Sequence, residues 1–490
     1  MLFAAVVSGQ SLQKFRTFYS LDEMKVPDAK SATASDGVFW AAAGRGLYRG
    51  GTEYFAGKRY LPDDEVLGLK PDASRGMWVR TRTGVSHIEL RPMTLERKAA
   101  VFEERIRLRH DRYGMVSDSH LSKAGDLSTN VLESSDNDGL WTAMYGAAEC
   151  FRYAVTKDPD ALARAKRAVE AVLFLEEITG VPGLPARSYV KKGEAPPKDG
   201  VWHWTKDGRI QWKGDTSSDE SVGHFFLLSI AYDLLDDAAL KVRLATAARK
   251  MTDYIIGHGY NLIDVTGKPT TWGKWSPEYF SGKGKSDSAL NAAEFLMFLK
   301  VTEHLTGDAK YAAEYNKVAV QMKYAAQAAR YLELREEINY SDEELAMLSF
   351  YPFFRYAKDS AMQKGLDQWW ANCEREKNPL WTYIYRVGRP EAKVDLDSAV
   401  KTLERIPMDL ITWKVVNSDR RDVVMEQALD RANERQARTW LAPDERPVMK
   451  WNGNPFVVDG GNGGFSEDDG AFFLLPYWMG RYMGVISAER

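Results

Sequence analysis

The sequence contains few of the residues that usually build metal or disulfide sites. Among its 490 residues are two cysteines, Cys150 and Cys373, and seven histidines. Two separated cysteines within apolar, helix-like segments form neither a disulfide framework nor a zinc motif, so we predict two buried thiols. The common G-x-x-x-x-G-K-[ST], G-x-S-x-G, H-E-x-x-H and C-x-x-C motifs are also absent, which excludes the most recognisable nucleotide-binding, serine-hydrolase and metalloprotease signatures.

An excess of charge of one sign is absent as well. Lys and Arg number 66 and Asp and Glu number 69, giving a net charge of -3. A nearly neutral chain gives no support for a nucleic-acid partner. No run approaches 18 apolar residues, so no transmembrane span is predicted.

The N-terminus carries a short apolar run that ends in small residues. We interpret residues 1–13 as a signal peptide or leader remnant, which predicts a secreted or periplasmic protein. The alternative is a terminus that is disordered or forms a strand.

Residues 14–91 are rich in glycine and β-forming residues and contain an internal repeat. Trp40 and Trp78 lie 38 positions apart, and each is followed six residues later by a glycine, Gly46 or Gly84. A strand–turn–strand unit that recurs at about 40 residues is typical of propeller blades. Two copies cannot close a propeller, so we predict a small β domain attached to the main domain.

The remainder, residues 92–490, is predicted to be helical. Twelve segments have apolar residues at helical spacing: 93–110, 138–155, 160–178, 219–235, 238–256, 288–305, 310–332, 342–357, 362–376, 379–388, 395–406 and 470–484. Short turns join them in pairs, and the first member of most pairs is the more apolar. We therefore predict a mainly α protein, an (α/α)6 toroid of six helical hairpins with the small N-terminal β appendage. An open helical solenoid is the alternative.

Long loops between the pairs collect histidine, arginine and aromatic residues. In a ring of hairpins these loops precede the inner helices, whose N-termini favour anions. We expect a substrate-binding mouth there, and the 15 Trp and 23 Tyr include flat faces suited to sugar rings. The candidate catalytic residues are His110, Tyr113, His203, Asp138, Asp215 and Glu220. The candidate substrate-binding residues are Arg112, Arg187, Trp202, Trp204, Trp212, His224, Trp272, Trp275, Trp381, Asn417 and Arg420.

Several of these residues have structural explanations too. Ser217 and Glu220 form a capping-box pattern, and His224 lies one turn beyond Glu220, where it is either a core histidine or half of a weak metal pair. Residues 136–139 cap a helix or form a loose calcium loop. We predict no metal site and leave open a divalent cation, calcium among them, as a cofactor.

Four segments carry a resemblance to a known group of proteins. They are HDRYG (110–114), SSDNDGLWTAMY (134–145), WKGDTSSDE with GHFF (212–226), and NPLW with IY (378–385). Over residues 37–484 the chain resembles secreted bacterial (α/α)-toroid carbohydrate-active proteins with two-component-regulator-propeller-like repeats, and it is similar to rhamnose–glucuronate polysaccharide lyases. The resemblance implies an acidic polysaccharide or oligosaccharide as the substrate.

Three functions follow from these observations. A uronate lyase needs a group that neutralises the sugar carboxylate, a base and an acid, and the histidine, arginine and tyrosine residues supply them. We favour this β-elimination. A glycoside hydrolase needs two carboxylates, for which the candidates are Asp136, Asp138, Asp215, Asp219, Glu220, Asp342, Glu343 and Asp468. The third reading is a non-catalytic glycan-binding protein.

Overall fold

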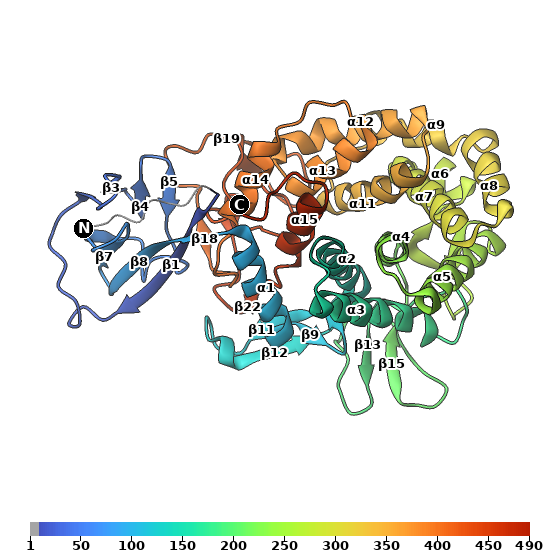
Figure 1. Cartoon of the computed structure of the whole chain (residues 1–490), viewed down its shortest axis with the longest axis horizontal. Helices are drawn as coiled ribbons and strands as arrows, with labels where there is room; N and C mark the ends of the chain where they lie inside the picture. Colours follow the sequence, from blue (N-terminus) through green and yellow to red (C-terminus); the bar gives the residue numbers. More distant parts are fainter. Residues whose placement is uncertain (1–8) are drawn as a thin grey trace.

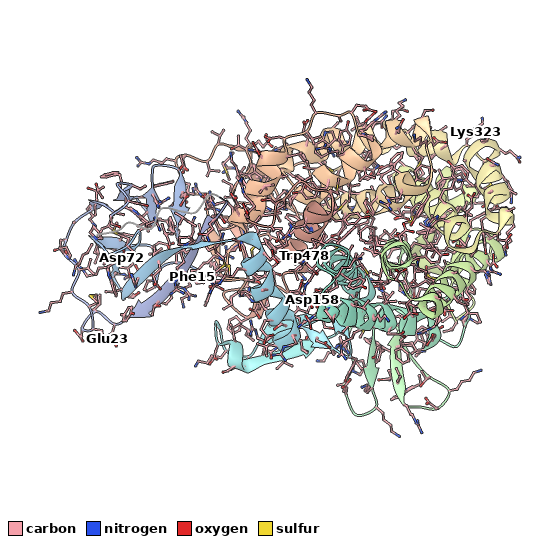
Figure 2. The ribbon with its side chains drawn as sticks, viewed as in Figure 1. Phe15, Glu23, Asp72, Asp158, Lys323 and Trp478 are labelled. Atoms are coloured by element: carbon pink, nitrogen blue, oxygen red, sulfur yellow. The ribbon has the colours of Figure 1, made fainter. Side chains whose placement is uncertain are left out.

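The computed structural model describes residues 9–490 and shows an elongated molecule with N-terminal strands at one end and helices at the other (Figure 1). Asp72 marks the strand end and Lys323 the helical end (Figure 2). The helices, with η for 3-10 or π turns, are α1 (Leu95–Arg109), η1 (Leu127–Thr129), α2 (Asp138–Thr156), α3 (Pro159–Glu177), α4 (Ser218–Leu234), α5 (Ala238–Gly257), α6 (Pro277–Ser281), α7 (Ser288–Thr306), α8 (Ala309–Asn316), η2 (Lys317–Gln321), α9 (Tyr324–Ala328), α10 (Tyr331–Leu334), α11 (Tyr340–Tyr356), α12 (Ser360–Cys373), η3 (Glu374–Glu376), α13 (Pro379–Gly388), α14 (Leu396–Arg405) and α15 (Ala471–Tyr482).

Strands occur along most of the chain. They are β1 (Ser11–Tyr19), β2 (Ser31–Thr33), β3 (Phe39–Ala42), β4 (Leu47–Arg49), β5 (Glu53–Phe55), β6 (Val66–Pro71), β7 (Met77–Thr81), β8 (Val85–Met93), β9 (Asp111–Arg112), β10 (Met115–Val116), β11 (Asp118–Leu121), β12 (Asn130–Glu133), β13 (Tyr189–Lys191), β14 (Trp202–Trp204), β15 (Ile210–Lys213), β16 (Asn261–Ile263), β17 (Pro269–Lys274), β18 (Val415–Val416), β19 (Met425–Gln427), β20 (Arg435–Ala437), β21 (Asp459–Gly460) and β22 (Ser466–Glu467).

The predicted fold class, a mainly α toroid with strands confined to one small appendage, is wrong. Helix accounts for 43% of the structure and strand for 18%, spread over many small sheets, which makes this a mixed α/β protein. Most of the missed strands have two to four residues and lie in the long loops. Strands this short carry too little alternation to be recognised, and they form because a neighbouring segment supplies the hydrogen bonds.

The N-terminal part contains two four-stranded sheets, ordered β1-β8-β7-β6 and β2-β3-β4-β5. The two sequence repeats form equivalent antiparallel hairpins, β3–β4 and β7–β8. Trp40 is fully buried and packs on Phe55 with ring centroids 5.0 Å apart, so this part has a hydrophobic core of its own. The division at residues 13 and 91 stays a prediction.

The proposed leader falls mostly outside the described residues. Residues 1–8 are not described, and Ser11 begins β1, which pairs with β8 from Ser11↔Met93 to Tyr19↔Val85. Among residues 9–490, no helix is both long enough and apolar enough to cross a membrane.

The helices pack around a shared core. The buried helices α2, α4, α7, α11, α13 and α15 contact their successors in this order, and α15 also contacts α2. The inner members are apolar on nearly every side; for example, Phe225 of α4 stacks on Phe298 of α7 at 4.3 Å. Replacing a buried phenylalanine such as Phe225 by alanine costs about 3–5 kcal/mol. Both cysteines lie in this core, which confirms the prediction of buried thiols.

One predicted helix, 310–332, is broken into four pieces. The chain leaves α8 through the π turn η2, and Lys323 then adopts a left-handed conformation with φ 62° before α9 begins. A non-glycine residue in this region is uncommon and ends the regular hydrogen-bond ladder. The break brings Tyr331 of α10 against Trp369 of α12, with ring centroids 3.5 Å apart.

Candidate functional site

The N-terminal ends of three buried helices surround one cavity of about 150 Å³. Ser218 at the start of α4, Asp287 before α7, and Asp342 in the first turn of α11 line it. Aromatic and basic side chains complete the wall, namely Trp272, Tyr279, Tyr331, Trp369, Arg335 and Arg431. We call this space the carboxylate pocket, because Asp287 and Asp342 line it and the charge of Asp219, the residue after Ser218, also acts on Asp342.

Asp342 is the carboxyl group whose environment is most altered in this pocket. Burial and the negative charges of Asp287 and Asp219 raise the pKa of Asp342 to about 7. A single donor opposes this effect, the side-chain amide of Asn339, which lies 2.9 Å from Oδ1. With its pKa raised to about 7, a large fraction of the Asp342 carboxyl groups is protonated near neutral pH and can give up the proton, as a general acid must.

The other two aspartates are held differently. The Tyr279 hydroxyl donates to Oδ2 of Asp287 at 2.6 Å, and the Ser286 hydroxyl donates to Oδ1 at 3.0 Å. Asp219 receives one long hydrogen bond, from Asn137 Nδ2 at 3.4 Å. Asp287 is thus fixed by two donors, whereas Asp219 retains an oxygen that can accept a proton from a bound molecule.

Two fully buried glutamates lie behind the aspartates. Burial raises the pKa of Glu294 to about 8, although the Trp275 indole donates to it at 2.7 Å. Burial and Asp219 raise the pKa of Glu344 to about 8, while Lys450 opposes the shift. Both groups are therefore neutral near pH 7, which limits the negative charge that accumulates around Asp219 and Asp342.

A second, separate hollow is lined by residues of α2, α11 and α15. Trp141, Glu344, Lys450 and Trp451 line it together with Asp469. Lys450 Nζ lies 3.3 Å from Asp469 Oδ2 and 5.0 Å from the Trp141 ring centre. Lys450 brings the positive charge of this hollow close to Glu344.

The structure separates the three residues expected to perform elimination. His110 is 1% exposed, and its ring nitrogens face Ser117 O at 3.2 Å and Glu467 at 3.5 Å. Tyr113 lines a different hollow and donates to Glu194. His203 packs on Trp212 at 4.6 Å and lies 3.6 Å from Asp264. These residues have different neighbours and do not line the carboxylate pocket.

The three predicted catalytic carboxylates stabilise the loops. Asp138 is buried and pairs with Arg112 at 2.6 Å. Asp215 has φ 52° and accepts hydrogen bonds from the backbone and side chain of Thr271. Glu220 is fully buried against the start of α2, where it accepts from Leu140 N at 3.4 Å. Each one links two segments that lie 26 or more residues apart in the sequence.

The predicted substrate-binding residues divide by exposure. Trp272 is 55% exposed and lines the carboxylate pocket, and Trp204 is 53% exposed on the β14 hairpin beside the partly exposed Trp202. Arg187 binds Asn137 and Asp136, next to the pocket. Arg112, Trp212, His224, Trp275, Trp381 and Asn417 are buried. Arg420 pairs with Glu445 and Asp422 near the N-terminal sheets.

His224 is explained by its protein partners. Its ring nitrogens lie 2.7 Å from Glu220 O and 3.1 Å from Val172 O, and burial lowers the pKa of His224 to about 4. Of the two alternatives, a core histidine or half of a metal pair, His224 is the core histidine. Both of its ring nitrogens face backbone carbonyl groups inside the fold.

Comparison with known proteins leaves the family open. No protein-family model matches the chain, and no curated protein matches it. Among solved structures, it is similar to a metagenome-derived glycoside hydrolase family 9 endoglucanase, at 10% sequence identity and a TM-score of 0.34, covering 98% of this chain and 94% of that chain. A likeness this distant assigns neither a family nor an activity, so the site is interpreted from its own geometry.

The sequence pointed to some of these residues and missed others. Asp219 and Asp342 were among eight hydrolase candidates, and nothing in their spacing separated them from helix-capping acids. Asp287 was missed, although it stands directly before a strongly apolar helix, as Asp342 stands in the first turn of another. Lys450 and Trp141 were missed because they come together with Glu344 only in the folded structure. Glu344 is more than a hundred residues from Lys450 along the chain.

Proposed function

We propose that the protein is a carbohydrate-active enzyme that hydrolyses glycosidic bonds in the carboxylate pocket. The observation that carries the proposal is the placement of Asp342 in one cavity with Asp287, where burial and the charges of Asp287 and Asp219 raise its pKa to about 7. Glycoside hydrolysis uses one protonated carboxyl group and one carboxylate across the scissile bond. The aromatic faces of Trp272 and Tyr279 in the same wall suit the apolar faces of sugar rings.

In this proposal Asp342 is the general acid and Asp219 is the base. Asp342 donates its proton to the leaving oxygen as the bond to the sugar carbon breaks. Asp219, whose second oxygen is available, accepts a proton from the attacking water. Asp287 is held by Tyr279 and Ser286 and acts by keeping the proton on Asp342.

Elimination is less well supported by the same pocket. The carboxylates of Asp287 and the neighbouring Asp219 repel a sugar carboxylate, which the lyase reaction must bind and neutralise. The tyrosine candidates for a base are also unfavourable, because burial raises the pKa of Tyr279 and Tyr331 far above 10. Arg335 and Arg431 line the pocket and could bind an acidic sugar, so uronate-containing substrates belong in the test.

The test is a product analysis with a panel of neutral and uronate-containing polysaccharides and oligosaccharides. Hydrolysis predicts new reducing ends without ultraviolet absorbance from an unsaturated sugar. Product that carries this absorbance would assign the reaction as elimination. Binding without any product would leave a glycan-binding protein. We also propose export from the cytoplasm, because a polymeric substrate of this class lies outside the cell; fractionation of the producing cell tests that proposal.

A further inference from the structure

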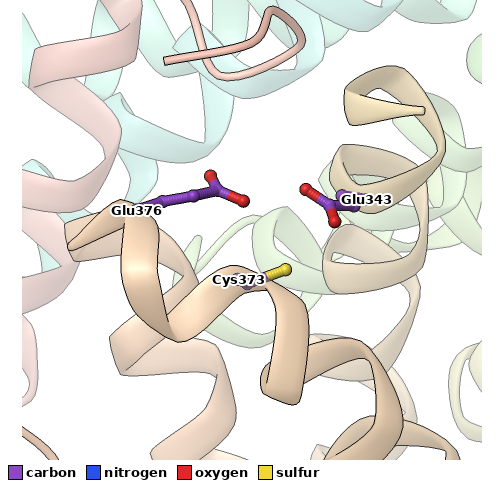
Figure 3. A group of neighbouring side chains, drawn as sticks. All are labelled: Glu343, Cys373 and Glu376. Carbon is purple, nitrogen blue, oxygen red and sulfur yellow. The ribbon is translucent and has the colours of Figure 1, made fainter. Parts of the chain in front are cut away.

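A second cluster of reactive side chains lies behind the carboxylate pocket. Glu343 of α11, Cys373 at the end of α12 and Glu376 of η3 are 1%, 1% and 4% exposed. One ligand atom from each lies within 4.8 Å of the other two. Figure 3 shows the two carboxyl groups pointing toward each other, with the Cys373 sulfur beside the gap between them.

The two carboxyl groups are poorly satisfied by the protein around them. Glu343 Oε2 and Glu376 Oε1 are buried without a hydrogen-bond partner among the described residues. Asn372 donates to the other oxygen of Glu343 at 3.0 Å. Buried polar oxygens that lack a partner cost about 1–3 kcal/mol each, so such a pair calls for a ligand or a shared proton.

Nearby cations do not pair directly with the cluster. Arg335 acts on Glu343 through its charge, and among residues 9–490 the two side chains form no direct ion pair. Arg446 is the buried cation that acts on Glu376, but its guanidinium donates to Val448 O and Leu441 O. A divalent cation placed between the carboxylates would balance their two negative charges, and a Cys373 thiolate would leave one net negative charge near the buried Arg446.

We infer that Glu343, Cys373 and Glu376 form a binding site for a borderline-soft divalent cation of the zinc class. A sulfur ligand disfavours calcium and magnesium, which take oxygen ligands, whereas two carboxylates and one thiolate would supply three of the four ligands of a tetrahedral zinc ion, with water as the fourth. A site this deeply buried has a structural role. It joins α11, which carries Asp342, to α12 and to the turn that leads into α13.

The experiment measures metal content and spectra of the purified full-length chain. After saturation with zinc sulfate and desalting, we expect about one zinc per chain by elemental analysis. Cobalt chloride added to chelator-treated protein should give a thiolate-to-cobalt charge-transfer band, which requires a cysteine ligand. Zinc added to the same apoprotein should raise the midpoint of thermal unfolding.

Variants decide whether these three residues bind the ion. Glu376→Gln and Cys373→Ser should reduce bound zinc at least tenfold, and Cys373→Ser should abolish the cobalt band. Cys150→Ser is the matched control, because Cys150 is the other buried cysteine and is not part of the cluster; it should keep both signals. Circular dichroism confirms that each variant is folded. Folded wild-type protein that binds no zinc or cobalt, or a band that survives Cys373→Ser, would overturn the inference.

Discussion

At the scale of single residues, the proton on Asp342 determines how the proposed activity depends on pH. A general acid must be protonated, and the pKa of Asp342 is raised to about 7 by burial and by its aspartate neighbours. We expect kcat/KM to fall as the pH rises above about 7. A pH–rate profile on the substrate found in the panel measures this alkaline limb.

Asp287→Asn tests whether Asp342 is the group that titrates in that profile. The substitution keeps oxygen and nitrogen atoms near Tyr279 but removes one negative charge that acts on Asp342. The pKa of Asp342 should then decrease, and the alkaline limb should move to lower pH. A limb that stays in place would show that Asp342 is not the titrating acid.

The buried carboxyl group of Glu294 should make the stability of the fold depend on pH. Burial raises its pKa from 4.5 to about 8, so the folded state binds this proton more tightly than the unfolded state. The contribution of Glu294 to the free energy of unfolding is fully present below pH 4.5. That contribution, on the order of a few kcal/mol, is lost as the pH rises toward 8. Glu294→Gln keeps an acceptor for the Trp275 indole and cannot ionise.

The measurement is the free energy of unfolding in urea at several pH values. Wild type should lose stability between pH 4.5 and 8, and Glu294→Gln should lose less over the same range. Identical slopes for both proteins would contradict the assignment of the buried proton to Glu294.

At the scale of secondary-structure elements, the β16–β17 hairpin presents Trp272 to the carboxylate pocket. The indole is 55% exposed and lines the pocket wall. Loss of an aromatic stacking face costs roughly 1.5–3 kcal/mol, so Trp272→Ala should raise KM by about tenfold or more and change kcat little. Trp204→Ala is the control, because Trp204 is equally exposed but lies outside the pocket lining. If the two substitutions had equal effects, the β16–β17 hairpin would have no specific part in substrate binding.

Element positions could be predicted from the sequence better than element contacts could. The helical periodicity of 138–155 and 219–235 predicted α2 and α4 to within a residue or two at most ends, because burial of one face requires that pattern. The two-residue strands β18 and β21 are 43 residues apart and pair only because the chain folds back. Asp342 of α11 and its partners Asp219 of α4 and Asp287 before α7 come together for the same reason, so no local pattern revealed them.

At the scale of the whole molecule, a buried ion-pair network joins the N-terminal sheets to the helical part. Asp444 is 4% exposed and accepts from Lys14 of β1 at 2.6 Å and from Arg405 of α14 at 2.7 Å. The two cations hold the pKa of Asp444 well below its usual range despite its burial. Removing one partner of a buried network leaves uncompensated charge, at a cost of about 3–5 kcal/mol.

Asp444→Asn should therefore lower the free energy of unfolding by that amount and separate the unfolding of the two parts into two transitions. Calorimetry and urea titration measure both effects. Glu104→Gln is the control, because its ion pair with Arg107 is exposed and should contribute little. A single transition at wild-type stability would show that Asp444 does not hold the parts together.

The central claim is that the carboxylate pocket performs the chemistry, and the most direct test is the kcat of Asp342→Asn compared with that of Asp215→Asn. Asp215 is a nearby aspartate whose oxygens are bound to Thr271, outside the pocket lining. We predict that Asp342→Asn lowers kcat by about 10²–10⁴-fold with the fold intact, and that Asp215→Asn changes kcat only a few-fold. A folded Asp342→Asn protein with wild-type turnover would contradict the account.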